Sequence, residues 1–206
     1  MSNCILRRSV AVVFAGILGL GVRELFAEPP RVLLLGDAGS EGQVRGALRS
    51  AGHDVVYGGL YYEWNGVDPD VDDFDVVVYL DAIDYGYGLL PAADAAVSAF
   101  VAAGGGLVIT EWSTYDDHHD YLSPGISALM PVTAPVGGCD YESTWHVLDP
   151  THQLAGWLPP AWRDAAGYSI VVPHANATVV IESAGGNPML TYRTDVGGRV
   201  VHSTTI

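Results

Sequence analysis

The stretch RVLLLG, residues 31–36, decides the fold that this sequence predicts. A short, continuous apolar run that ends in glycine is typical of a parallel strand buried on both faces. Residues 40–43, Ser-Glu-Gly-Gln, have the form of a capping box, and apolar residues recur after them at the spacing of one helix face. Gly52 ends this predicted helix, and residues 53–57 form a second strand. The segment is therefore a β-α-β unit with a right-handed crossover.

A second pair of strands follows after a longer connection. Residues 58–73 are rich in Gly, Asp and aromatics, and they lead to a third apolar run at 74–80. Pro91 opens a helix at a position where its missing N–H costs nothing, glycines 104–106 end it, and residues 107–110 form a fourth strand. The pattern predicts a three-layer, flavodoxin-like α/β fold, in which an open parallel sheet carries helices on both faces.

The second half of the chain is less regular. Residues 123–130 predict a short helix, and the later apolar runs are short and separated by turn residues. These runs cover residues 169–172, 178–182, 189–192 and 199–201. Residues 185–188 have the composition of a hairpin turn, so antiparallel strands should extend the parallel sheet. We expect one domain over residues 28–206, and its last apolar run lies so near residue 206 that we expect a truncated C-terminus or a missing final helix.

The first 27 residues have the composition of a secretory signal peptide. Arg7 and Arg8 precede an apolar run at 10–22, which is shorter than the roughly 20 residues that span a bilayer. Cleavage after Ala27 would give a secreted or periplasmic protein with no membrane insertion. The alternative is an uncleaved N-terminal anchor.

The composition argues against one class of partner. The formal net charge is −15, and the chain contains no lysine. So acidic a surface repels phosphate backbones, and nucleic acid is therefore not an expected partner. A small polar molecule or another protein is the expected partner instead.

Three stretches together resemble a known family. Residues 32–36 open the sheet, and residues 97–109, VSAFVAAGGGLVI, are similar to the helix, glycine turn and strand that lead to the nucleophile elbow of class I glutamine amidotransferase-like domains. Residues 149–159, DPTHQLAGWLP, resemble a segment common in the trehalose-utilisation-type branch of that superfamily. The resemblance covers most of residues 31–206 and implies a flavodoxin-like domain.

The sequence departs from this family at the elbow. The amidotransferases carry a nucleophilic cysteine on the turn after the elbow strand, whereas this chain has Thr-Glu-Trp-Ser at 110–113. Cys139 lies in a different segment, without a strand-turn-helix context. Glutaminase activity is therefore not expected, and a non-catalytic member of the superfamily is the first interpretation.

Acidic and aromatic residues follow the predicted strands at the edge where open α/β sheets place their ligands. Aromatic faces cover the apolar C–H patches of sugars while carboxylates accept hydrogen bonds from hydroxyls, so this edge is a candidate carbohydrate site. The predicted ligand-binding residues are Asp37, Ser40, Tyr61, Tyr62, Trp64, Asp81 and Trp112, with Asp84 and Glu111 at the same edge. The alternative interpretation is that Asp37 caps a turn and the tyrosines shield the sheet edge.

Ser40 lies near the N-terminus of the first predicted helix, where free N–H groups can hold an anion. Residues 36–40, Gly-Asp-Ala-Gly-Ser, lack both the lysine of a P-loop and the three glycines of a dinucleotide fingerprint. No nucleotide cofactor is therefore expected.

Residues 110–121, TEWSTYDDHHDY, decide between a binding protein and an enzyme. Imidazole and carboxylate suit zinc, iron or manganese, so Asp116, His118 and His119 are candidate ligands of a divalent metal. Glu111 with His118 is the candidate acid–base pair, because burial at the elbow, a strained turn in the superfamily, would raise the pKa of the glutamate. No H-E-x-x-H motif is present, and the alternative is a solvated acidic loop.

Two hypotheses of different class remain at this point. The first is an exported, non-catalytic domain that binds a small polar ligand, such as a carbohydrate, or a protein partner at the strand C-terminal edge. The second is a metal- or carboxylate-dependent hydrolase that acts on a carbohydrate or a related small molecule. The enzyme requires Glu111 and a histidine within hydrogen-bonding reach of a common point, or bridged by a metal.

Overall fold

The computed structural model describes residues 29–142, 144–163 and 166–205. The predicted signal peptide at 1–27 lies outside these residues. In the part of the chain that is described, no helix combines the length and the apolar character needed to span a bilayer.

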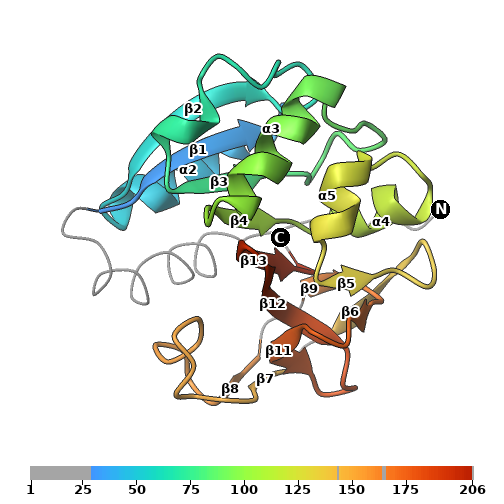
Figure 1. The fold of residues 1–206 in the computed structure, drawn as a ribbon. Helices are drawn as coiled ribbons and strands as arrows, with labels where there is room; N and C mark the ends of the chain where they lie inside the picture. The colour runs from blue at the N-terminus through green and yellow to red at the C-terminus, as the bar shows by residue number, and fades with distance from the viewer. Residues whose placement is uncertain (1–28, 143, 164–165, 206) are drawn as a thin grey trace.

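Five parallel strands form one half of a mixed sheet. They are β1 (Arg31–Gly36), β2 (Asp54–Leu60), β3 (Val76–Tyr79), β4 (Gly106–Ile109) and β13 (Gly198–Ser203). In space their order is β2-β1-β3-β4-β13 (Figure 1), which is the order of a flavodoxin-like sheet. The predicted open parallel sheet is therefore confirmed, although its fifth strand comes from the C-terminal region of the chain.

Antiparallel strands extend this sheet beyond β13, as predicted. They are β12 (Pro188–Val196), β11 (Thr178–Ser183), β7 (Trp145–Val147) and β8 (Ala161–Trp162). The complete sheet has nine strands in the order β2-β1-β3-β4-β13-β12-β11-β7-β8. The predicted hairpin turn joins β11 to β12, where the N–H of Ser183 donates to the carbonyl of Asn187 over 2.8 Å.

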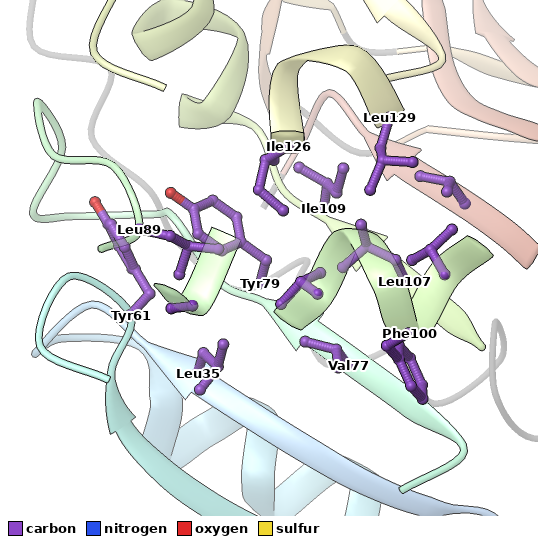
Figure 2. Close-up of a cluster of buried hydrophobic side chains, with 14 of the residues drawn as sticks. Leu35, Tyr61, Val77, Tyr79, Leu89, Phe100, Leu107, Ile109, Ile126 and Leu129 are labelled. Carbon is purple, nitrogen blue, oxygen red and sulfur yellow. The ribbon is translucent and has the colours of Figure 1, made fainter. Parts of the chain in front are cut away.

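Helices cover both faces of the parallel half. The helices are α2 (Glu41–Ser50), α3 (Pro91–Ala102), α4 (Trp112–His118), α5 (Pro124–Leu129) and the 3₁₀ turn η1 (Val71–Asp73). Val32 and Leu34 of β1 belong to one apolar cluster with Val44 and Leu48 of α2. The intervening residues, such as Leu35, belong to a second cluster, which also includes residues of α3 and α5 (Figure 2). Alternate side chains of one strand thus enter two cores, the physical basis of the three-layer fold.

Two small antiparallel sheets lie beside the main one. The first pairs β5 (Val132–Thr133) with β10 (Val172–Pro173), and the second pairs β6 (Cys139–Glu142) with β9 (Ala166–Ser169). The single strand expected at 169–172 is therefore wrong. The chain there changes between two sheets, with exposed Ile170 and buried Val171 at the crossing.

Two local predictions in the β1–α2–β2 unit have different outcomes. Gly52 ends α2 with φ +94°, the left-handed conformation that glycine adopts without steric cost. The capping box at 40–43 does not form, since Ser40 makes no side-chain capping hydrogen bond to the helix. Its hydroxyl donates instead to Asp37 Oδ1 over 3.3 Å. The hydroxyl thus bonds to the turn after β1, and its oxygen accepts no N–H of the helix.

Candidate ligand-binding surface at the strand ends

Neighbouring parallel strands end in register, and acids follow three of them. Leu35, Tyr79 and Ile109 are partners across β1, β3 and β4. Two residues after each of these comes an acid, namely Asp37, Asp81 and Glu111. The N–H of Trp112 donates to the carbonyl of Asp81 over 3.3 Å, which keeps the chain after β4 beside the chain after β3. The structure thus brings three of the predicted site residues to one edge of the sheet, and all three are buried.

Asp37 uses its carboxylate on the protein itself. Oδ2 accepts the N–H of Ala82 over 2.7 Å and also that of Ile83, while Oδ1 accepts the N–H groups of Gly39 and Ser40 at 3.3 Å. These bonds tie the turn after β1 to the segment after β3. Asp37 is fully buried, and its acceptors are occupied by backbone donors. This arrangement agrees with the alternative interpretation, in which Asp37 caps a turn. Ser40 is also buried and belongs to the same turn.

Asp81 and Asp116 form a buried carboxyl pair. Both residues are fully buried, Asp81 at the end of β3 and Asp116 in α4. Burial raises the pKa of Asp81 well above its usual range, and the neighbouring Asp116 and Asp37 carboxylates raise it further. Burial likewise raises the pKa of Asp116, opposed by backbone N–H donors from Gly86 and Tyr87. Like charges so close cannot both ionise easily, so the pair retains a proton that its members share.

Glu111 occupies the elbow position without the backbone strain expected there. Its φ and ψ are −47° and −54°, which is ordinary helical geometry at the N-cap of α4. The prediction of a strained turn is wrong because the chain passes directly from β4 into a helix. The prediction of an elevated pKa agrees with the geometry, since burial raises the pKa of Glu111 from 4.5 to about 8. Its side chain is only 3% exposed, which restricts access to solutes.

The proposed acid–base pair is not assembled in this structure. Glu111 and His118 lie at the two ends of α4, about 10 Å apart along the helix axis at 1.5 Å per residue. His118 is exposed, and its Nδ1 contacts the carbonyl of Ala134 at 3.1 Å. The stretch expected to be a loop is therefore largely a helix, and the helix separates the two groups.

The predicted metal ligands also have other partners. His119 Nδ1 contacts the carbonyl of Tyr115 at 2.8 Å, and both Asp116 oxygens accept the N–H of Gly86, at 2.9 and 3.0 Å. The two histidines are exposed, whereas Asp116 is fully buried. Within residues 29–142, 144–163 and 166–205, no group of three or more His, Cys, Asp or Glu side chains is arranged to hold a metal ion.

The predicted aromatic residues separate into core and surface. Tyr61 and Trp64 are buried, and they donate hydrogen bonds to the carbonyls of Asp84 and Pro69 at 2.8 and 3.2 Å. Figure 2 shows Tyr61 beside Tyr79 and Leu89 in the second apolar cluster, and burial raises its phenol pKa. Tyr62 is partly exposed, and its hydrogen bond to Asp84 Oδ2 raises its pKa to about 12. Tyr61 and Trp64 thus belong to the core, and their hydrogen bonds hold the chain at Asp84 and at Pro69.

Sequence reasoning missed three exposed tyrosines, two in the segment after β3 and one after α4. Tyr85, Tyr87 and Tyr121 are 45%, 50% and 49% exposed. Tyr85 stacks on Trp112, with ring centroids 4.6 Å apart and planes 11° from parallel. The only signal in the sequence is the alternation of tyrosine with glycine in DYGYG, residues 84–88.

These rings form two groups, which we together call the aromatic surface. One group runs from Trp112 and Tyr85 to Tyr121, and the other is the pair Tyr62 and Tyr87, which the chain at 85–87 connects to it. Tyr115 joins Tyr85 to His119, since its ring lies 5.1 Å from that of Tyr85 and 4.0 Å from the imidazole. The surface consists of Tyr62, Tyr85, Tyr87, Trp112, Tyr115, His119 and Tyr121. Asp84 and Asp120 adjoin these residues in the sequence, and Asp84 Oδ2 accepts the hydroxyl of Tyr62 over 2.9 Å, so the surface includes a carboxylate beside its ring faces.

The sequence singled out two other residues, Cys139 and His152, which lie in a strand and in a local turn. Cys139 begins β6. His152 Nδ1 accepts the N–H of Leu154 over 3.2 Å, and its ring lies 4.8 Å from that of Tyr192. These contacts agree with a local turn role for His152.

Comparisons by sequence found no relative of this chain. No family model matches it. No curated protein matches it either.

Comparisons of structure found many similar folds. A cytoplasmic protein of Salmonella typhimurium superposes with a TM-score of 0.66 at 16% identity, over 84% of this chain and 86% of that one. A ThuA-like protein of Parabacteroides merdae has a TM-score of 0.61 at 15% identity, over 86% and 79% of the two chains. The cold-adapted β-galactosidase of a Rahnella species has a TM-score of 0.58 at 16% identity. The match takes in 85% of this chain but 28% of the enzyme. At such identities the comparisons show the fold alone, an α/β fold that this chain shares with these proteins.

Proposed function

We propose that this protein is an exported, non-catalytic amidotransferase-like domain, which binds a carbohydrate or a related small polar molecule on the aromatic surface. The observation that carries the proposal is the group of half-exposed rings at the C-terminal ends of β3 and β4, the edge where open α/β sheets bind ligands. Export is proposed from the signal-peptide pattern at 1–27.

The chemistry of the aromatic surface favours a sugar over other small ligands. Exposed ring faces can cover the C–H patches of a pyranose, and nearby carboxylates can accept its hydroxyl hydrogen bonds. The net charge of −15 disfavours phosphorylated or otherwise anionic ligands. The comparisons agree in kind, since one neighbour is called ThuA-like, the trehalose-utilisation class, and another is called a β-galactosidase.

Calorimetric titration with neutral disaccharides, including trehalose and lactose, tests the proposal on the exported protein. Tyr85→Ala should weaken the binding of a disaccharide about tenfold or more, as truncation of a central aromatic contact does. Tyr141→Ala is the matched control, because Tyr141 is 55% exposed but lies in β6, outside the aromatic surface. Equal affinities for the two variants, or no binding of any neutral sugar, would overturn the proposal.

A carboxylate-dependent hydrolase is the second candidate, and one observation favours it. The pKa of Glu111 at about 8 suits a general acid at neutral pH. Glu111→Gln distinguishes the two functions, because it should leave sugar binding unchanged while abolishing any hydrolysis of a nitrophenyl glycoside. Hydrolysis by the wild-type protein that disappears in this variant would establish the enzyme.

A further inference from the structure

The segment that carries Tyr85 and Tyr87 has no regular structure of its own. Residues 82–90, which we call the aromatic loop, contain neither helix nor strand. Hydrogen bonds from other elements hold the loop in place. Asp37 accepts the N–H groups of Ala82 and Ile83, and the hydroxyl of Tyr61 donates to the carbonyl of Asp84 over 2.8 Å. The middle of the loop therefore depends on a further anchor.

Asp116 is that anchor, and it acts through two groups. Its carboxylate accepts the N–H of Gly86, at 2.9 and 3.0 Å, and the neighbouring N–H of Tyr87 also lowers its pKa. Its main-chain carbonyl accepts the N–H of Tyr121 over 2.8 Å. Gly86 lies between Tyr85 and Tyr87 in the chain. One residue thus connects the backbone at all three exposed tyrosines of the aromatic surface.

The loop and the segment at 121–123 also fit closely together. A Cβ added at Gly88 would lie 2.7 Å from the carbonyl of Tyr121 and 2.9 Å from the N–H nitrogen of Ser123. Gly86 has φ +92°, a conformation that residues with a side chain rarely adopt. The two segments consequently form one unit around Asp116, and a shift of either one moves the tyrosines relative to each other.

Because Asp116 is buried, breaking its hydrogen bonds to the loop is costly. A fully buried carboxylate must be satisfied by donors, and the N–H groups of Gly86 and Tyr87 supply them. The carboxyl of Asp81 is the other hydrogen-bonding group beside the Asp116 carboxylate, so a loop that moved away would take the backbone donors from Asp116. Releasing the loop is therefore unfavourable for both partners, the unpaired backbone donors and the carboxylate.

We propose that Asp116 is the positioning residue of the aromatic surface, which fixes Tyr85, Tyr87 and Tyr121 in the arrangement that binds the ligand. The proposal rests on the proposed function for its ligand, although the positioning itself is a property of the free protein. A surface held in its bound arrangement loses less conformational entropy when the ligand binds, so a loosened loop lowers affinity without removing any ligand contact.

Three variants of the full chain test the proposal. Asp116→Ala removes both acceptor oxygens, and Asp116→Asn keeps the volume and one acceptor. Asp72→Asn is the matched control, because Asp72 is exposed and lies in η1, outside the aromatic surface. Hydrogen–deuterium exchange of peptides from residues 82–90 measures how firmly the loop is held. Titration with the best-bound neutral disaccharide measures the affinity of the aromatic surface.

We expect Asp116→Ala to increase exchange in the aromatic loop at least tenfold, with peptides of α3 unchanged, and to weaken disaccharide binding about tenfold. Asp116→Asn should lie between the wild type and the alanine variant in both measurements. Loop exchange in Asp116→Asn equal to that in Asp72→Asn overturns the proposal, even if the alanine variant does not fold. If Tyr85→Ala loses sugar binding but Asp116→Ala retains it, the positioning role is overturned while the proposed function stands. The absence of any sugar binding overturns the proposed function, and the exchange data still decide whether Asp116 positions the loop.

Discussion

Asp81 and Asp116 bring two carboxyl groups together in the interior of the protein, one from the end of a strand and one from a helix. The Asp81 oxygens have no hydrogen bond of standard geometry within the described residues, although the Ser113 hydroxyl and the Asp116 carboxylate lie beside them. Asp116, in contrast, receives N–H donors from the aromatic loop. The two members thus differ in role: Asp81 is the protonated neighbour, and Asp116 is the charged anchor.

Asp81→Asn should stabilise the protein at pH 8. The pKa of Asp81 is raised by burial, so its folded pKa lies above the unfolded value. The stability that it contributes is complete below the unfolded pKa and is lost as pH rises. Asparagine stays neutral at every pH and still offers an N–H donor to Asp116. Urea unfolding at pH 5 and pH 8 measures the effect, and a larger loss between these pH values in the variant than in the wild type would contradict it.

Glu111 should make the free energy of unfolding fall as pH rises from about 4.5 to about 8. Its pKa is about 8 in the folded state against 4.5 in the unfolded chain, so the folded protein binds the proton more tightly. At about 1.4 kcal/mol per pH unit, the loss over this range is a few kcal/mol. Glu111→Gln should flatten the profile, whereas Glu63→Gln at an exposed site should leave it as it is. Parallel profiles for all three proteins would exclude a buried, protonated Glu111.

His202 should have the opposite pH dependence. Burial lowers its pKa from 6.5 to about 3, so the stability that it contributes is present above 6.5 and is lost as pH falls. Within the described residues, neither ring nitrogen has a hydrogen-bond partner. His202→Met removes two unpaired polar atoms and should raise stability at pH 5 by about 1–3 kcal/mol. The exposed His174→Met is the control. A variant less stable than the wild type at pH 5 would argue that His202 is satisfied by bound water.

Two glycine substitutions should change stability in opposite directions. A Cβ at Gly198 would lie 2.1 Å from the carbonyl oxygen of Gly105 and 2.6 Å from that of Val101, and backbone cannot yield cheaply. Gly198→Ala should therefore cost about 3 kcal/mol or more. Gly46 in α2 has nothing within 4 Å of the added Cβ, so Gly46→Ala should gain about 0.5–1 kcal/mol. Thermal unfolding of the pair measures both, and a gain at Gly198 would mean that β4 and β13 are less closely packed.

Chelation should leave the melting temperature unchanged. His118 and His119 are exposed and contact main-chain carbonyls, while Asp116 is occupied by the aromatic loop. Elemental mass spectrometry of untagged protein, with melting curves with and without chelator, provides the measurement. A stoichiometric transition metal whose removal lowers the melting temperature would revive the metalloenzyme hypothesis.

The sequence was most informative where local pattern and tertiary structure agree. Local sequence favours a single backbone conformation at three places, and the structure has that conformation at each of them. They are the strand at 31–36, the glycine at 52 and the turn at 185–188. The acids after β1, β3 and β4 could also be placed, because parallel strands that pair in register end at the same edge.

The site itself could not be read from local pattern. The polar stretch at 112–118 has the composition of a loop, yet tertiary contacts make it a helix with buried Ser113, Thr114 and Asp116. The pairing of Asp81 with Asp116 depends on that helix, and so does the stacking of Trp112 on Tyr85. The half-exposed tyrosines lie on a loop that carboxylates far away in the sequence hold in place. No rule about residue spacing predicts such contacts.

The position of β13 has a consequence for how the chain reaches its native state. Residues 198–203 lie about ninety residues after β4 in the chain, yet they form the strand that joins the parallel and antiparallel halves of the sheet. Until this strand is in place, β4 and β12 each lack a neighbour. The two halves therefore cannot close into one sheet before β13 pairs with β4, and that pairing closes a loop of about ninety residues. We therefore expect slow folding, with the insertion of a central strand as a late step.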